Sequence, residues 1–327
     1  MWIEDYNLRA SGSNHAPPSR GARPSVSRDS RQVPIHYNLR WAILLVLTAL
    51  AFTVQNLSAA AQTRPLDPIA AKMEPDRKVL YKTVGDRKLH LNIFDPPGFK
   101  STDKRPAYVA IHGGGWTGMT PRYFYPFADH FAKLGMVGIS IDYRLANKAR
   151  RTTVFDCVKD ARSAMRYIRS HASELGIDPD RIVVAGGSAG GHLASSTSLF
   201  TKVNETTDDA TISPEATAMI LYYPVIDTSA KGYGQKKIGD RWRELSPVDN
   251  VRPGVPPTLI LHGTGDKVTP FPGAKLFHER MIAAGNSCQL ITHKDGRHGY
   301  FIFDLELFAT AMKQTEAFLK EQKLLPQ

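Results

Sequence analysis

The sequence predicts an α/β fold with a mostly parallel β-sheet and helices on both of its faces. From residue 78 onward, short apolar and β-branched runs alternate with longer segments of helical periodicity. This alternation is typical of parallel strands joined by helices. Ser188, Asp266 and His298 each lie in a loop that follows a predicted strand. In open parallel sheets the functional groups stand at the carboxyl ends of strands, so this placement fits the same fold.

Composition indicates an ordinary globular protein without a nucleic-acid partner. The chain has 327 residues, of which 42% are hydrophobic and 22% charged, so it can bury a large core. Its formal charge of +11 comes from scattered basic residues rather than from a long Lys/Arg run, which indicates a solvated basic surface. Two cysteines exclude a disulfide-rich scaffold and a four-cysteine zinc site. We expect Cys157 and Cys288 to be buried thiols, with one disulfide as the alternative.

The first 61 residues differ from the rest of the chain and resemble a leader. Residues 1–40 are rich in Ser, Pro and Arg, which predicts disorder. Residues 41–54 form an apolar run that is shorter than the ~20 residues of a membrane span. Alanines at 59–61 follow, so we expect export with cleavage between Ala61 and Gln62, and a retained membrane anchor is the alternative. Residues 62–77 are predicted to be a linker, and residues 78–323 the folded domain.

Local signals place the remaining elements. Gly85-Asp86 joins two strands, residues 79–84 and 88–94, in a predicted β-hairpin. Glycines stop two of the predicted helices, at Gly135 and Gly176. The further predicted strands are residues 107–112, 137–143, 182–185, 219–223, 258–262 and 288–293. The predicted helices are residues 122–134, 153–175, 191–199, 272–284 and 305–323.

Ser188 stands in a strand–turn–helix motif that can expose a reactive hydroxyl. Glycines two residues before and two residues after it give the pattern G-x-S-x-G. Missing side chains at these positions let the strand and helix approach closely and leave the serine in a strained, exposed turn. The alternative is a glycine-rich turn that contains a serine by chance.

A second glycine-rich motif, His-Gly-Gly-Gly-Trp at residues 112–116, follows an earlier predicted strand. Glycines leave backbone N–H groups unobstructed, and such donors can stabilise an oxyanion. The alternative is a flexible loop. An HGGG sequence ahead of G-x-S-x-G is typical of the oxyanion loops of lipases and esterases.

With these two motifs the chain resembles the α/β-hydrolase superfamily, and within it the hormone-sensitive-lipase-like esterases and the acetylxylan-type carbohydrate esterases. The resemblance spans residues 78–319. It implies an α/β-hydrolase fold and a Ser-His-Asp triad. It also implies that the oxyanion donors are the N–H groups of Gly114, Gly115 and Ala189. Residues 62–77 are polar and residues 228–254 basic and glycine-containing, so neither offers an amphipathic helix pair and we expect a small or minimal cap.

The acid and the base of the triad follow in the chain order of this fold. Asp266 lies in a turn after predicted strand 258–262, and this segment closely resembles the family's acid loop. Asp227, after the preceding strand, is the competing acid. His298 lies in a glycine-flanked loop before the last helix and is the predicted base. The other histidines beside strands and glycine motifs are expected to have local roles; they are His112, His192, His262 and His293.

The predicted activity is hydrolysis of short-chain carboxylic esters, acetylated carbohydrates among them, through an acyl-enzyme. No metal or cofactor is expected, since the chain has no Rossmann fingerprint, Walker A motif or H-E-x-x-H motif. Trp116 is expected to limit the acyl pocket, and residues 228–254 to form a cap or substrate-edge loop. One alternative is a secreted prolyl-oligopeptidase-type peptidase, which the HGGGW loop disfavours. Another is a non-catalytic binding protein, which would be expected to have lost the reactive residues.

Overall fold

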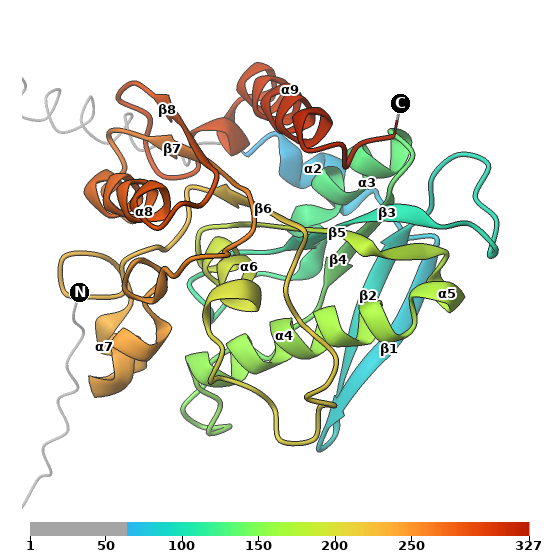
Figure 1. Cartoon of the computed structure of the whole chain (residues 1–327), viewed down its shortest axis with the longest axis horizontal. Helices are drawn as coiled ribbons and strands as arrows, with labels where there is room; N and C mark the ends of the chain where they lie inside the picture. The colour runs from blue at the N-terminus through green and yellow to red at the C-terminus, as the bar shows by residue number, and fades with distance from the viewer. Residues whose placement is uncertain (1–63, 327) are drawn as a thin grey trace, which may run out of the picture. The chain divides into compact units, whose positions relative to one another are not determined.

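The computed structural model describes residues 64–326, and within them eight strands form one sheet (Figure 1). The predicted leader and its cleavage site lie outside the described residues. The strand order is β1-β2-β4-β3-β5-β6-β7-β8. Pairs β1–β2 and β2–β4 are antiparallel and the other pairs are parallel, so the predicted mostly parallel sheet is confirmed. The strands are β1 (Arg77–Val84), β2 (Arg87–Phe94), β3 (Arg105–Ile111), β4 (Val137–Ile141), β5 (Ile177–Gly187), β6 (Ala218–Tyr222), β7 (Thr258–Gly263) and β8 (Cys288–His293).

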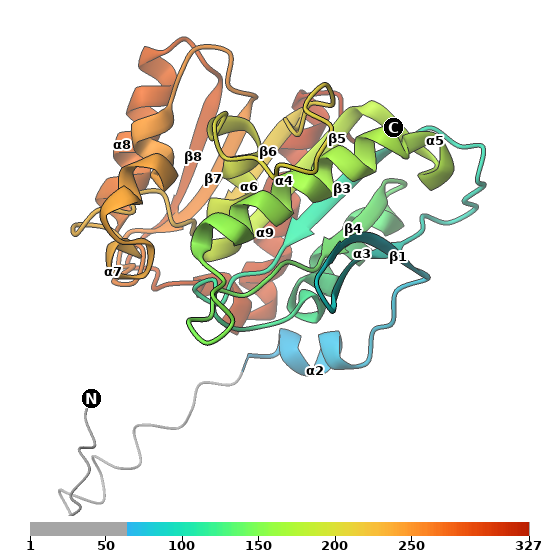
Figure 2. The ribbon, with the colours of Figure 1, turned by 90° about the horizontal axis from the view of Figure 1, so that it is seen from below.

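Helices cover both faces of this sheet, as Figures 1 and 2 show. The helices are α2 (Leu66–Ala71), α3 (Tyr125–Lys133), α4 (Val154–Ser170), α5 (Ala172–Leu175), α6 (Ala189–Leu199), α7 (Gln235–Ile238), α8 (Phe271–Ala283) and α9 (Leu305–Glu321). Strand residues alternate between two cores. In β3, Val109 packs in the core of α4, α6 and α8, whereas its neighbour Tyr108 packs in the core of α2, α3 and α9. Both faces are therefore buried, which explains the nearly continuous apolar strands.

Some helix boundaries differ from the predicted ones. The predicted helix 122–134 begins as a 3₁₀ turn, η1 (Pro121–Phe124), and α3 starts only at Tyr125. Pro126, in the first turn of α3, has no N–H to donate to that preceding turn. The predicted helix 153–175 is two helices, α4 and α5, which meet at His171, and Gly176 ends the second in a left-handed conformation.

The predicted linker at 62–77 is wrong for the part that the structure describes. Residues 66–71 form helix α2, in which Leu66 and Ala70 are buried. One guanidinium nitrogen of Arg122 donates to the carbonyl oxygens of Ala70, Ala71 and Met73, at 3.3, 3.1 and 2.6 Å. Ala70 and Ala71 are the last residues of α2 and Met73 follows it, so Arg122 fastens the end of this segment to the domain.

Residues 228–254 form short helical turns beside the sheet. They are α7, η2 (Asp240–Leu245) and η3 (Pro247–Asn250), and none is long enough to make an amphipathic cap helix. This agrees with the predicted small cap. Cys157 and Cys288 are buried free thiols. No helix within residues 64–326 is both long and apolar enough to cross a membrane.

The close packing of α3 on β4 gives a test of the fold. A methyl group on Gly138 in β4 would overlap the carbonyl oxygen of Ala128 in α3, whereas one on Gly118 would lie 3.8 Å from its nearest neighbour. We expect Gly138→Ala to lower the free energy of unfolding by about 1–3 kcal/mol, because the helix must move away from the sheet. Gly118→Ala, the matched control, should change it by less than about 0.5 kcal/mol. Denaturant unfolding measures both, and equal stabilities would contradict the packing.

Candidate active site

Ser188 lies on a sharp turn between β5 and α6. Its backbone has φ 56° and ψ −122°, which is strained for a residue with a side chain. A methyl group on Gly186 would overlap the carbonyl oxygen of Gly190, and one on Gly190 would overlap that of Ile111. The two glycines of the motif are therefore needed for strands and helix to meet at this turn. The Ser188 N–H donates to the carbonyl oxygen of Tyr222 at 3.0 Å, which ties the turn to β6.

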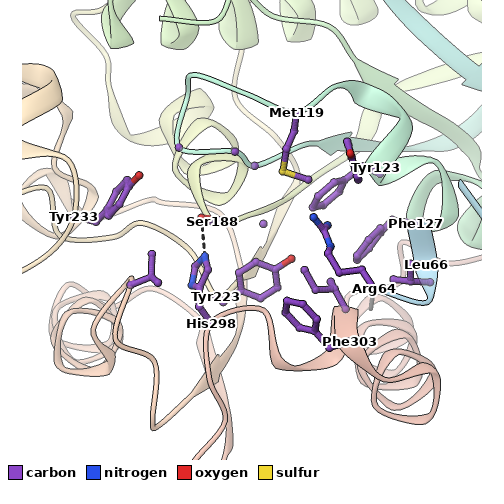
Figure 3. A pocket seen from close by; sticks show the side chains of 17 residues that line it. Arg64, Leu66, Met119, Tyr123, Phe127, Ser188, Tyr223, Tyr233, His298 and Phe303 are labelled. Carbon is purple, nitrogen blue, oxygen red and sulfur yellow. Dashed lines mark hydrogen bonds between the residues drawn. The ribbon is translucent and has the colours of Figure 1, made fainter. Parts of the chain in front are cut away.

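The structure brings Ser188, His298 and Asp266 together at the carboxyl edge of the sheet. His298 Nε2 lies 2.9 Å from Ser188 Oγ, a contact that Figure 3 marks with a dashed line. His298 Nδ1 lies 2.8 Å from Asp266 Oδ2. The three residues follow strands β5, β7 and β8, so one hydrogen-bonded chain joins loops that are far apart in sequence.

The Asp266 carboxylate is almost fully hydrogen-bonded. Its Oδ1 accepts the N–H groups of Val268 and Thr269 at 2.8 and 2.9 Å, and its Oδ2 accepts the Thr269 hydroxyl at 2.8 Å. Burial acts to raise the pKa of Asp266, but the hydrogen bonds from His298 and Thr269 outweigh it and hold the pKa below its ordinary value. Asp266 is therefore ionised at neutral pH. Sequence reasoning missed Thr269, although an aspartate followed by a threonine three residues later in a turn is a recognisable signal.

Asp227, the competing acid, lies in different surroundings. Its carboxylate accepts the N–H of Ser229 at 2.8 Å, and its carbonyl oxygen accepts the N–H of Tyr233 at 2.8 Å. It borders a small crevice with Pro270 and Gly273. Asp227 thus shapes the start of the 228–254 segment, and among the described contacts of His298 the carboxylate partner is Asp266.

The four histidines that flank strands and glycine motifs have local partners. His112 Nδ1 lies 3.0 Å from the carbonyl oxygen of Gly113, and His192 Nε2 lies 2.7 Å from that of Leu245. Burial lowers the pKa of each of these two to about 4, so both are neutral at pH 7. His262 Nε2 contacts the carbonyl oxygen of Thr269 at 2.8 Å, and the His293 ring stacks on Tyr300.

The loop of three glycines runs beside Ser188. Gly113, Gly114 and Gly115 line the same pocket as Ser188, and a methyl group on Gly113 would lie 3.2 Å from Ser188 Cβ. Gly114 and Gly115 have φ 93° and 59°, a region that favours glycine. Ala189 is the first residue of α6, so its N–H is one of the unpaired donors of that helix.

Trp116 does not lie where the sequence placed it. It is fully buried and is not among the residues that line the pocket. Its ring packs edge-on against His192 and tilted against Tyr233. A methyl group on Gly234 would lie 2.6 Å from it. Its ring turns inward and supports the 228–254 segment instead of limiting a substrate.

A pocket of about 280 Å³ opens at Ser188 and is mostly apolar (Figure 3). Its walls come from both ends of the domain. They include four residues that the sequence analysis did not single out: Arg64 and Leu66 from the N-terminal segment, Tyr233 from the 228–254 segment and Phe303 from η4 (Tyr300–Phe303). Beside Tyr233, Lys237 Nζ donates to the carbonyl oxygen of Gly115 at 3.1 Å and to the Tyr233 hydroxyl at 2.8 Å. This contact joins α7 to the glycine loop.

Comparison with known proteins identifies relatives along most of the described domain. A family model described as BD-FAE matches residues 91–281. The chain is 28% identical over 231 residues to the probable carboxylic ester hydrolase LipM of Mycobacterium tuberculosis, covering 63% of this chain and 51% of LipM. It is 30% identical over 261 residues to carboxylesterase NlhH of the same species, covering 72% and 80%. The chain spans about half the length of LipM and of the related esterase LipQ.

Solved structures give a similar picture. Esterase 2 of Thermogutta terrifontis, in its apo form, is 39% identical with a TM-score of 0.72, covering 77% of this chain and 96% of that one. Structures of that esterase include propionate-bound and butyrate-bound forms. These likenesses agree with the α/β-hydrolase fold expected from the sequence. The family model matches more than half of the residues of this chain. The chain therefore belongs to the BD-FAE family of α/β-hydrolase esterases.

Proposed function

We propose that this protein is a serine ester hydrolase that cleaves short-chain acyl esters through a triad of Ser188, His298 and Asp266. The observation that carries the proposal is the unbroken hydrogen-bonded chain from Ser188 Oγ through His298 to the Asp266 carboxylate. Membership of an esterase family supports the same reaction class.

In this mechanism His298 Nε2 accepts the proton of Ser188 Oγ while the oxygen attacks the ester carbonyl carbon. The C–O bond to the alcohol then breaks, and His298 returns the proton to the leaving alcohol. Water, deprotonated by His298, attacks the acyl-enzyme. The ester bond to Ser188 Oγ then breaks, Oγ takes the proton back from His298, and the acid is released. Asp266 stays ionised, holds the proton on Nδ1 and stabilises the imidazolium that forms in each half-reaction.

The oxyanion of each tetrahedral intermediate needs donors that are already in place. We assign this role to the N–H groups of Gly114, Gly115 and Ala189. The position of the glycines beside Ser188 and of Ala189 at a helix N-terminus supports the assignment. Each such donor contributes about 3–4 kcal/mol to the transition state in comparable hydrolases. The contact of Lys237 with Gly115 would help to keep the loop in this conformation.

The choice between the two aspartates can be tested directly. Asp266→Asn should lower kcat by roughly 10⁴, because the amide favours the wrong tautomer of His298. Asp227→Asn, the matched control on a carboxylate without contact to His298, should lower it by far less. Hydrolysis of 4-nitrophenyl acetate measures both variants, with Ser188→Ala as the inactive reference. The opposite ranking would refute the triad assignment.

A second test concerns the acyl chain. The pocket is small, and the 228–254 segment lacks the amphipathic helix pair that would shelter a long chain. A methylene group that stays in water does not gain the favourable burial free energy of about 0.8 kcal/mol. We therefore expect kcat/KM for 4-nitrophenyl esters to be highest between about C2 and C4, because further methylene groups would stay in water. The propionate and butyrate complexes of the Thermogutta esterase support this range. Values that rise from acetate through octanoate to palmitate would contradict it.

Acetylated carbohydrate is our proposed natural substrate, and export of the enzyme goes with it. A polysaccharide outside the cell is reached only by an exported protein. The short apolar run at 41–54 followed by small residues supports removal of a signal segment.

Expression of the full chain in a Sec-competent bacterium should therefore give a mature N-terminus near Gln62, as read by N-terminal sequencing, and the product should release acetate from acetylated oligosaccharides. An uncleaved protein that needs detergent would instead support a membrane anchor. Cleavage without acetate release would rule out this substrate class and leave export standing.

A further inference from the structure

Arg64 brings a positive charge into the pocket beside Ser188. Besides His298 it is the one basic residue among the described pocket-lining residues, which include no carboxylate. Figure 3 shows its guanidinium end pointing into the pocket toward Tyr123. The guanidinium carbon lies 5.1 Å from the centre of the Tyr123 ring. A cation thus stands in a pocket that is otherwise mostly apolar.

The charge of Arg64 is poorly compensated within the described residues. Its Nε atom is buried and has no hydrogen-bond partner there. The nearest carboxylate oxygen, Asp67 Oδ1, lies 3.4 Å from Nε, and the side chain of Asp67 is 38% exposed. Leu66 and Phe127 line the same part of the pocket. The Arg64 side chain is itself 27% exposed, so its ion pair with Asp67 is a weak one and the guanidinium is open to an anion that enters the pocket.

The segment that carries Arg64 is held in place. Arg122 donates to three carbonyl oxygens at the end of α2, and its neighbour Tyr123 stacks on the Arg64 guanidinium. Two consecutive residues of η1 therefore fix the two ends of this short segment. The backbone around Arg64 is therefore already held in place. This favours ligand binding, because the segment loses little conformational freedom when a ligand binds.

The charge also acts on the wall of the reaction centre. Burial raises the pKa of the Tyr223 hydroxyl, and the positive charge of Arg64 opposes that rise. The Tyr223 ring packs edge-on against His298 at 5.1 Å, and a methyl group on Gly187 would lie 2.8 Å from the Tyr223 hydroxyl. The charge of Arg64 is thus felt at Tyr223, a residue of the pocket wall next to Ser188.

We propose that Arg64 binds a carboxylate carried by the ester substrate, so that the enzyme prefers esters with this anionic group to neutral esters of the same size. The planar guanidinium presents paired N–H donors that match the two oxygens of a carboxylate. The proposal rests on ester hydrolysis at Ser188. The carboxylate can belong to the acyl part, as in a monoester of a dicarboxylic acid, or to the alcohol part, as in an acetylated sugar that carries an acid group.

The test compares kcat/KM for matched pairs that differ only in charge. For the acyl part, monomethyl succinate and monomethyl glutarate are paired with their amides, and methanol release is measured. For the alcohol part, 4-acetoxybenzoate is paired with 4-acetoxybenzamide, and acetate release is measured. We expect the carboxylate to be preferred in one arm. The charge ratio is kcat/KM for the carboxylate divided by kcat/KM for its amide. In Arg64→Met the charge ratio should fall roughly tenfold to hundredfold, the range for a hydrogen bond to a charged group. Arg64→Lys should keep part of it.

Arg297→Met is the matched control for net charge. Its guanidinium packs on the outside of the pocket residue Phe303, 3.7 Å from the ring centre, and Arg297 is not a lining residue. The charge ratio should stay unchanged in this variant. An equal fall in both variants would mean a general field effect and overturn the proposal, as would a ratio that Arg64→Met leaves unaltered. Absence of hydrolysis of every ester in both arms, charged and neutral, by the wild-type protein would instead refute the proposed function.

A second measurement covers the case in which Arg64→Met melts at a much lower temperature than the wild type. Benzoate and benzamide are then compared as competitive inhibitors of the wild-type enzyme with a neutral ester. Stronger inhibition by benzoate, weakened by added salt, would support the carboxylate site. Equal inhibition by the two compounds would overturn it.

Discussion

The strained turn at Ser188 is the constraint on which the rest of the structure depends. A residue with a side chain holds φ 56° there only because three backbones meet without side chains between them. Gly186 and Gly190 remove the β-carbons at the closest approaches, and the N–H of Ser188 is bound by β6. The turn therefore forms only when β3, β5, β6 and α6 are all packed.

The parallel sheet then explains how the other reactive groups reach this turn. Strands β5, β6, β7 and β8 are consecutive neighbours, so the loops at their carboxyl ends share one edge. His298 crosses from the loop after β8 to Ser188, and Asp266 meets it from the loop after β7. Thr269 and two backbone N–H groups fix the carboxylate before it contacts the imidazole. An acid that is preorganised in this way favours a single orientation of His298.

The surroundings of this centre come from parts of the chain with no chemical motif. The N-terminal segment contributes Arg64 and Leu66, and the 228–254 segment contributes Tyr233. Trp116 stabilises the 228–254 segment from the interior of the domain, since its ring is buried against Tyr233 and His192. The reaction centre and its pocket thus depend on different kinds of interaction. Backbone geometry specifies the centre, and side-chain packing of peripheral segments specifies the pocket.

The sequence by itself determined the α/β architecture, since alternating strand and helix patterns and glycine signals act over a few residues. It also predicted the strand β8, for which expected and observed bounds agree, and the candidate residues Ser188, Asp266 and His298, because each stands in a short recognisable loop. Only the tertiary structure decided what depends on contacts between distant segments. These contacts place Asp266 rather than Asp227 beside His298, bury Trp116 away from the pocket, and fold α2 from an expected linker. They also bring Arg64 to the same pocket as Phe303, more than two hundred residues later in the chain. The physical reason is that hydrogen-bond geometry and burial belong to pairs of segments, whereas sequence patterns report each segment alone.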